Sequence, residues 1–185
     1  LVQKGDTLYG YDDNGNRISE KNAEGVRRFS YNEDNFLLGV EDAHGKITNY
    51  GYDALNRRIA KTSGAATTEY LYDGLEVVNE LQEDGRTKLY NRAGGKIVSL
   101  NLGLQNGENA NSPAENPSPK KLFYFYDGLG SVVGLTDTQG ERQTRYHYDA
   151  FGELIDGDTT VNEYTYTGQR LDPESGLYHF HFRQY

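Results

Sequence analysis

Two histidines near the end of the chain have the spacing of a metal-binding pair. His179 and His181 are two residues apart, so on a β-strand both imidazoles would point to the same face, where they could share a metal ion. No third ligand stands nearby in the sequence unless Asp172 or Glu174 folds back toward them. The phenylalanines that alternate with these histidines indicate that the opposite face is the packed one. We therefore interpret the pair as polar residues on a wet face and predict no metal site.

Other residue patterns that could support chemistry are weaker still. The run Asp12-Asp13-Asn14-Gly15 offers oxygen ligands, but it lacks the twelve-residue spacing and the closing Glu of a calcium loop. The glycine runs at 94–96 and 128–131 do not lead into a helical pattern, as a phosphate-binding loop would. Nothing in the sequence favours a Ser/His/Asp triad around the four histidines, His44, His147, His179 and His181. From these patterns we predict no catalytic residue, no cofactor and no metal.

Repeated aromatic units dominate the chain and would position any functional residue. The second tyrosine of the unit stands at 11, 31, 52 and 72, which are steps of 20, 21 and 20 residues, and the pattern resumes at 126, 148 and 166. The units are Tyr9-Gly10-Tyr11-Asp12, Phe29-Ser30-Tyr31-Asn32, Tyr50-Gly51-Tyr52-Asp53, Tyr70-Leu71-Tyr72-Asp73, Tyr124-Phe125-Tyr126-Asp127, Tyr146-His147-Tyr148-Asp149 and Tyr164-Thr165-Tyr166-Thr167, which lacks the acid.

Each unit is predicted to form a strand that ends in a tight turn. Tyrosines at alternate positions lie on one face of a strand, so Tyr9 and Tyr11 should share a face, as should the matching pairs of the other units. The Asp side chain can accept a hydrogen bond from the backbone two residues later. Gly or Asn, which tolerate a left-handed backbone, stands three residues after the acid, at Gly15, Asn35, Asn56, Gly130 and Gly152. We expect a second set of turns at Gly25, Gly45, Gly85 and Gly140, whereas Glu76 breaks the pattern of the Asp73 unit.

The fold class that follows is all-β. Reversals about every ten residues leave strands of roughly six residues, or about 20 Å. Hydrophobic residues make up only 35% of the chain, and that share includes 16 Tyr, which suits a sheet with partly wet faces because a tyrosine ring packs while its hydroxyl finds a partner. We predict an antiparallel meander of hairpins built on the Tyr-x-Tyr-Asp unit, with about fourteen to sixteen strands, curved or spiralling because flat sheets of that length are unusual.

Composition and charge exclude several classes of partner. A net charge of −9 disfavours binding to nucleic acid and to anionic lipid. No apolar run approaches the ~18 residues that span a bilayer, and residues 1–8 lack the apolar segment of a signal peptide. The chain contains no Cys and no Met. The first absence excludes disulfides, and the second leads us to expect a piece of a longer polypeptide.

One segment interrupts the repeats. Residues 103–120 read GLQNGENANSPAENPSPK, which holds three of the four prolines and shows no alternation of apolar and polar residues. Such a segment is typical of a surface insertion, and we interpret it as a tolerated insertion rather than a binding loop. The predicted organisation is a repeat sheet at 1–102, an insertion at 103–121 and a second sheet at 122–185.

The tyrosine units resemble the YD repeats of RHS proteins, insecticidal toxin-complex C subunits, wall-associated bacterial toxins and animal teneurins. Residues 123–152, FYFYDGLGSVVGLTDTQGERQTRYHYDAFG, resemble the opening of the RHS repeat-associated core, and residues 164–185, YTYTGQRLDPESGLYHFHFRQY, resemble its close. The resemblance covers the chain apart from the insertion. It implies a strip of β-sheet that spirals into a hollow shell, often around a toxic C-terminal domain that self-cleavage releases.

Arg170 and Asp172 become candidates through this resemblance. They match core residues near the self-cleavage centre, where paired carboxylates activate a nucleophile. The second carboxylate is expected beyond residue 185, and a single Asp cannot form the pair. We therefore predict that Arg170 and Asp172 bond locally and fix the last hairpin.

Three functions remain in view. The first is a structural wall segment, not itself an enzyme, of a secreted or surface bacterial protein that encloses a C-terminal toxin. The second is an adhesion, carbohydrate-binding or fibre module, whose partners would be cell-surface glycans or neighbouring copies paired through sheet edges. The third is part of a self-cleavage centre completed beyond residue 185. We also expect the apolar strand Tyr178–Tyr185 to be paired or covered by another segment or chain.

Overall fold

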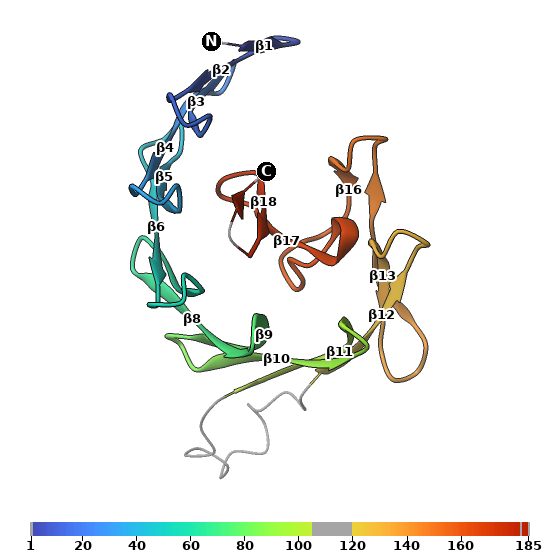
Figure 1. Cartoon of the computed structure of the whole chain (residues 1–185). Coiled ribbons are helices and arrows are strands. Elements are labelled where there is room, and N and C mark those ends of the chain that lie inside the picture. Colours follow the sequence, from blue (N-terminus) through green and yellow to red (C-terminus); the bar gives the residue numbers. More distant parts are fainter. Residues whose placement is uncertain (1, 105–119, 182, 185) are drawn as a thin grey trace. The chain divides into compact units, whose positions relative to one another are not determined.

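The computed structural model describes residues 2–104, 120–181 and 183–184 and consists almost entirely of antiparallel strands (Figure 1). In the described chain, fourteen strands form one sheet whose spatial order equals the chain order, which confirms the predicted meander. They are β1 (Val2–Lys4), β2 (Thr7–Tyr11), β3 (Arg17–Asn22), β4 (Gly25–Tyr31), β5 (Leu37–Glu41), β6 (Ile47–Tyr52), β7 (Arg58–Ser63), β8 (Ala66–Asp73), β9 (Glu76–Gln82), β10 (Arg86–Ala93), β11 (Lys96–Leu104), β12 (Lys120–Tyr126), β13 (Val132–Thr136) and β14 (Arg142–Arg145).

Short elements complete the described chain. They are β15 (His147–Tyr148), β16 (Leu154–Asp156), the 3₁₀ turn η2 (Tyr166–Gly168), β17 (Arg170–Asp172), β18 (Leu177–Phe180) and β19 (Arg183–Gln184). Over the residues that the structure describes, no helix is long and apolar enough to cross a membrane. The predicted low helix content is confirmed for these residues.

One turn geometry recurs at seven hairpins of the described chain. The first residue is Asp or Asn, and its side-chain oxygen accepts hydrogen bonds from the backbone N–H groups two and four residues later. The residue three positions on is Gly or Asn with φ between 61° and 90°, a conformation that Cβ disfavours in other residues. The turns begin at Asp12, Asn32, Asp42, Asp53, Asp127, Asp137 and Asp149. The predicted turn chemistry is confirmed, and it extends to the turns at Gly45 and Gly140.

Two units depart from this geometry. Asp73 is the last residue of β8 and pairs with Glu76 across a two-residue turn, so the Asp73 unit lacks the Asp turn, as Glu76 indicated. In the unit at 164–167 the turn starts two residues earlier than the tyrosine pattern suggests. Thr165 donates its backbone N–H to Gln169, and its carbonyl accepts from Gly168. Thr165 thus stands where the other units have Asp.

Paired tyrosines pack on the same face, as predicted. Tyr50 is buried in a cluster against which Tyr52 packs, and Tyr70 and Tyr146 are buried in a second cluster that also contacts Tyr72 and Tyr148. In these three pairs the first ring is the inner one and the second ring is half-buried, whereas in the first tyrosine unit Tyr9 is half-buried and Tyr11 is exposed.

Contacts between repeats also involve the second tyrosine. It donates its hydroxyl to a backbone carbonyl of an earlier strand, beyond the point where the strands are paired. These bonds are Tyr52 to Leu37 at 2.8 Å, Tyr126 to Ile97 at 2.7 Å and Tyr148 to Val132 at 2.6 Å. Two second tyrosines, Tyr148 and Tyr166, are also in ring contact, at 5.5 Å between centroids.

The chain divides into two compact units, each with its own core. The first comprises residues 1–67 and 174–185, and the second residues 68–173. The core of the first unit contains Phe29, Leu37, Val40, Tyr50 and Leu177. The core of the second contains Tyr70, Val77, Tyr90, Ile97, Leu100, Leu122, Tyr124, Val132, Leu135, Tyr146 and Tyr164. Tyrosine supplies much of the buried area, as the composition predicted.

The insertion and the last strand differ from the predicted boundaries. Strands β11 and β12 extend to Leu104 and from Lys120, so both ends of the segment predicted at 103–121 are strand. The remainder, 105–119, lies outside the described residues. The single strand predicted at Tyr178–Tyr185 is wrong, because β18 ends at Phe180 and pairs with β19 in a tight hairpin. This pairing lies within the predicted strand itself and so does not test whether another segment or chain covers it; Phe182 and Tyr185 lie outside the described residues.

Candidate functional site

Arg170 and Asp172 lie together in the interior of the second unit. They alternate on β17, so both side chains share its inner face, and their exposed fractions are 2% and 0%. Backbone bonds fix this strand: the Leu171 N–H donates to the carbonyl of Glu163 at 2.8 Å, and Tyr164 bridges to Arg170. Arg170 Nε lies 3.7 Å from Asp172 Oδ1, as an ion pair between two residues of one strand; that the two residues fix the last hairpin stays a prediction.

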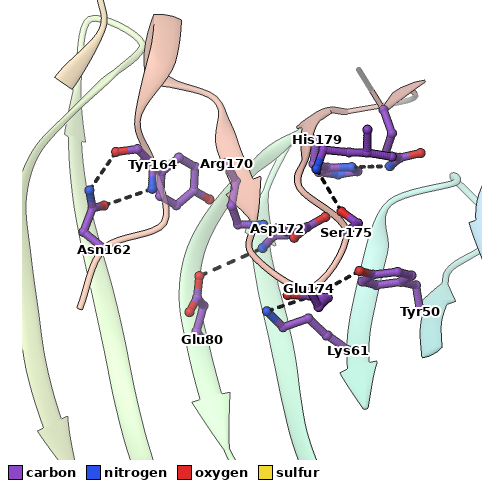
Figure 2. A network of polar contacts seen from close by, with 12 residues as sticks. Tyr50, Lys61, Glu80, Asn162, Tyr164, Arg170, Asp172, Glu174, Ser175 and His179 are labelled. Carbon is purple, nitrogen blue, oxygen red and sulfur yellow. Dashed lines mark hydrogen bonds and ion pairs between the residues drawn. The ribbon is translucent and has the colours of Figure 1, made fainter. Parts of the chain in front are cut away.

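The guanidinium of Arg170 contacts more than Asp172. Its Nη1 lies 4.0 Å from Oε1 of Glu80, and its carbon lies 4.2 Å from the ring centre of Tyr70, within reach of a cation–π interaction. Figure 2 shows Arg170 between the carboxylates of Glu80 and Asp172. Burial alone would lower the pKa of Arg170, but the neighbouring Tyr70, Asp172, Tyr164 and Glu80 raise it well above its ordinary value. The side chain therefore stays positively charged.

Glu80 is a buried carboxylate with partners of its own. It is 2% exposed and accepts a hydrogen bond from the hydroxyl of Tyr90 at 2.8 Å. Lys88 lies directly opposite it in the β9–β10 pair, with Nζ 3.7 Å from Oε2. Lys88 and Tyr90 alternate on β10, so both reach the same inner face.

Asn162 anchors the segment that leads to β17. Its carbonyl oxygen accepts from the hydroxyl of Tyr124 at 2.7 Å and from the N–H of Tyr164 at 3.1 Å. Its amide nitrogen donates to the carbonyl of Tyr164 at 2.7 Å and to the hydroxyl of Tyr146 at 3.2 Å. The side chain is fully buried, and all four of its contacts satisfy polar groups of the core. This residue ties the segment before Arg170 to β12.

The first unit holds a second polar cluster around Glu174 (Figure 2). The carboxylate of Glu174 accepts from the hydroxyl of Tyr50 at 2.8 Å and lies 3.5 Å from Nζ of Lys61. Arg27 donates to the carbonyl of Ser175 at 3.0 Å, and Ser175 Oγ accepts from the N–H of Leu177 at 3.1 Å. These contacts hold the turn at 174–177 against strands of the first unit.

A polar cleft of about 530 Å³ also lies in the first unit. Two Asp-type turns and the β18–β19 hairpin form its walls. The lining residues are Tyr11, Asn14, Gly15, Asn16, Arg17, Tyr31, Asp34, Asn35, Leu177, Arg183 and Gln184. Burial raises the pKa of Tyr31 to about 12, so its hydroxyl remains a hydrogen-bond donor at neutral pH.

The predicted positions of the two histidines are wrong in one respect. His181 lies in the turn after β18 with φ of 51°, so it does not alternate with His179 on one strand. His179 Nδ1 instead lies 2.8 Å from the side-chain nitrogen of Gln184. Within the described ranges, no group of three or more His, Asp or Glu side chains is arranged to hold a metal ion.

Sequence reasoning found Arg170 and Asp172 but missed the side chains that surround them. No local sequence motif around Glu80, Lys88 or Asn162 indicates that these residues belong to a site. One signal was available, because a reversal at Gly85 places Glu80 roughly opposite Lys88. The tyrosines and acids of the repeat units serve the turns and the core, and two of the tyrosines, Tyr70 and Tyr164, also interact with Arg170.

Together these features define a class of protein: a repeat sheet of antiparallel hairpins, closed by Asp turns and packed by tyrosine pairs. The chain belongs to the Teneurin YD-shell family, whose model matches residues 1–185.

Relatives and solved structures agree with this assignment. The tRNA3(Ser)-specific nuclease WapA of Bacillus spizizenii is 32% identical over 197 residues, which cover 100% of this chain and 8% of that protein. The double-stranded DNA deaminase toxin A of Burkholderia cenocepacia is 26% identical over 209 residues and is covered to 15%. The chain therefore spans a small part of the length of these relatives.

The fold is also that of solved toxin complexes. The crystal structure of TcdB2-TccC3-TEV matches with a TM-score of 0.72 at 17% identity, covering 95% of this chain and 9% of that chain. The Photorhabdus luminescens Tc holotoxin pore matches with a TM-score of 0.63 at 15% identity, covering 97% and 11%. At these identities the likeness establishes the fold.

Proposed function

We propose that this chain is a wall segment of a YD shell that encloses a toxic C-terminal polypeptide in a secreted or surface-exposed bacterial protein. The observation that carries the proposal is the match of the whole chain to the shell family, together with relatives that are named as a nuclease and a deaminase toxin. The structure supports a structural role, because the Asp turns, the tyrosine pairs and the hydroxyl bonds between strands all stabilise a continuous sheet.

Protease protection of the polypeptide encoded by the complete gene tests this function. An enclosed toxic segment should resist a protease that cleaves it rapidly once the shell is denatured. A variant that removes two Asp turns, Asp127→Ala with Asp149→Ala, should open the wall and speed cleavage of the enclosed segment. Asp156→Ala serves as a control, because that side chain is 77% exposed and lies in no Asp turn. Equal cleavage of the segment in the native and denatured protein would refute enclosure.

A second function is favoured by the burial of Asp172 beside Arg170. We infer that this pair belongs to a self-processing centre that hydrolyses a peptide bond of the same polypeptide. The Asp172 carboxylate would take a proton from water, whose oxygen bonds to the peptide carbonyl carbon. The carbon–nitrogen bond then breaks, and the proton passes to the leaving amine. Paired carboxylates support this chemistry because they divide the roles of base and acid.

Expression of the complete gene tests self-processing. The wild-type polypeptide should yield two fragments, and Asp172→Asn should yield one intact chain with the same far-UV circular dichroism. An Asp172→Asn polypeptide that is still cut would refute a role for this carboxylate.

Adhesion to glycans stays a prediction, and the polar cleft of the first unit is where we would test it. The cleft at the β18–β19 hairpin offers tyrosine hydroxyls, carboxamides and guanidinium groups that could bond to sugar hydroxyls. A glycan array probed with the wild type and with Arg183→Ala examines it. Binding that is lost in the variant would support adhesion.

A further inference from the structure

A second carboxylate lies beside Arg170 within this chain. Glu80, on β9, lies 4.0 Å from the guanidinium on one side, while Asp172 lies 3.7 Å from it on the other. We infer that Glu80 is a positioning residue of the self-processing centre, which acts through Arg170 by holding the guanidinium against Asp172. This inference rests on the second proposed function. Glu80 does not replace the second carboxylate of the catalytic pair, which is still expected beyond residue 185.

The guanidinium is held in three directions. Nη1, which contacts Glu80, and Nε, which contacts Asp172, belong to different edges of the planar group. The ring of Tyr70 lies over the guanidinium at 4.2 Å from its carbon. Among the described residues the guanidinium nitrogens make no hydrogen bond, so the group is oriented by charge attraction on two edges and by the ring on one face. Its orientation toward Asp172 therefore depends on Glu80.

Glu80 is itself held in place, so it can serve as an anchor. Oε1 accepts the hydroxyl hydrogen of Tyr90 at 2.8 Å, and Oε2 lies 3.7 Å from Nζ of Lys88. Each carboxylate oxygen thus has a partner on β10. Rotation of the carboxylate would break the bond to Tyr90 in an interior where no water replaces it, since Glu80 is 2% exposed.

The charges of the cluster balance. Two carboxylates, Glu80 and Asp172, face two cations, Lys88 and Arg170, in a buried site. Removal of one carboxylate charge would leave a buried cation without compensation, and the structure would relax to find a new partner for it. Among the described residues, other charged or titratable groups near this cluster include Tyr70, Tyr90, Arg92, Tyr124, Glu163 and Tyr164.

Two variants test the anchor in the polypeptide encoded by the complete gene. Glu80→Gln removes the charge that faces Arg170, and Tyr90→Phe keeps every charge and removes only the hydroxyl that holds Glu80. Glu76→Gln is the matched control, because Glu76 lies on the same strand and pairs with Arg92 instead. The rate of self-cleavage is measured as a function of pH, and far-UV circular dichroism reports the fold.

We expect Glu80→Gln to slow self-cleavage by about 10- to 100-fold, as loss of a residue that orients a functional group typically does. Tyr90→Phe should slow it less. It should also move the acid limb of the pH profile to higher pH, because a guanidinium that is held less firmly stabilises the Asp172 carboxylate less.

The outcomes separate the inference from the function on which it rests. No cleavage of the wild type refutes self-processing itself. A wild type that is cut, with both variants within twofold of its rate, overturns the role of Glu80 and leaves self-processing standing. If Glu80→Gln fails to fold, Tyr90→Phe decides. A slower Tyr90→Phe with an unmoved pH profile shows a structural effect only and also overturns the inference.

Discussion

The stability of the second unit should depend strongly on one buried amide. Asn162→Ala removes four hydrogen bonds, at 2.7, 3.1, 2.7 and 3.2 Å, from a side chain that is fully buried. A typical hydrogen bond contributes about 1 kcal/mol net, so four bonds give a loss of about 4 kcal/mol. The hydroxyl of Tyr124 also loses its acceptor. Because the site is closed to water, no new hydrogen bond offsets this loss of stability.

The assay is unfolding by guanidinium chloride, followed by tyrosine fluorescence because the chain contains no Trp. The matched control is Asn14→Ala, since Asn14 is exposed and its change should cost less than about 0.5 kcal/mol. A double-mutant cycle sharpens the test. Tyr124→Phe should cost about 1 kcal/mol in the wild type and nearly nothing in Asn162→Ala, because its partner is already gone. Additive losses, or a loss below about 1 kcal/mol for Asn162→Ala, would refute the reasoning.

Three further predictions concern turns and titration. Asn56 has a positive φ of 61°. Its change to Ala should lower the free energy of unfolding by about 1 kcal/mol, and its change to Gly should lower it little, as measured by urea unfolding. The pKa of Asp53 is lowered from its ordinary value of 3.8, mainly by the backbone hydrogen bond from Arg57. The carboxylate therefore stabilises the fold above pH 3.8, and this stabilisation is lost as the pH falls below 3.8. An acid titration followed by circular dichroism should show a weaker dependence of stability on acid in Asp53→Asn. Burial raises the pKa of Tyr126 to about 12. The contribution of its neutral hydroxyl to stability should therefore be complete below pH 10 and fall as the pH rises toward 12. Ultraviolet difference titration of the wild type and Tyr126→Phe checks this, and a Tyr126 that ionises near pH 10 would contradict it.

Local patterns predicted the fold because the decisive interactions are local. An Asp followed three residues later by Gly or Asn specifies its own turn, as at Asp127 and Gly130, since the side chain bonds to the backbone of the same loop. The same logic explains the error at the C-terminal hairpin. Alternation of aromatic and polar residues predicted one strand, but the backbone of His181 adopts a positive φ, which no local residue preference announced.

The candidate site could be predicted only in part, because its contacts join segments distant in the sequence. Arg170 and Asp172 stand two residues apart and were found together. Glu80 and Asn162 were not, since each obtains its role from tertiary packing against tyrosines of other strands. A buried polar residue has no local signature when its partners come from elsewhere in the chain.

The hydroxyl bonds of the second tyrosines have a mechanical consequence. Each joins the end of one strand to the carbonyl of an earlier strand, beyond the last backbone hydrogen bond between them. Each bond therefore holds the end at which the two strands would begin to separate. Under a pulling force, rupture should therefore proceed one repeat at a time. The repeat of 22 residues from Tyr126 to Tyr148 extends by about 75 Å when it is drawn out. Stretching of single molecules should show force peaks at that interval. Each Tyr→Phe change that removes one of these hydroxyl bonds should lower one peak.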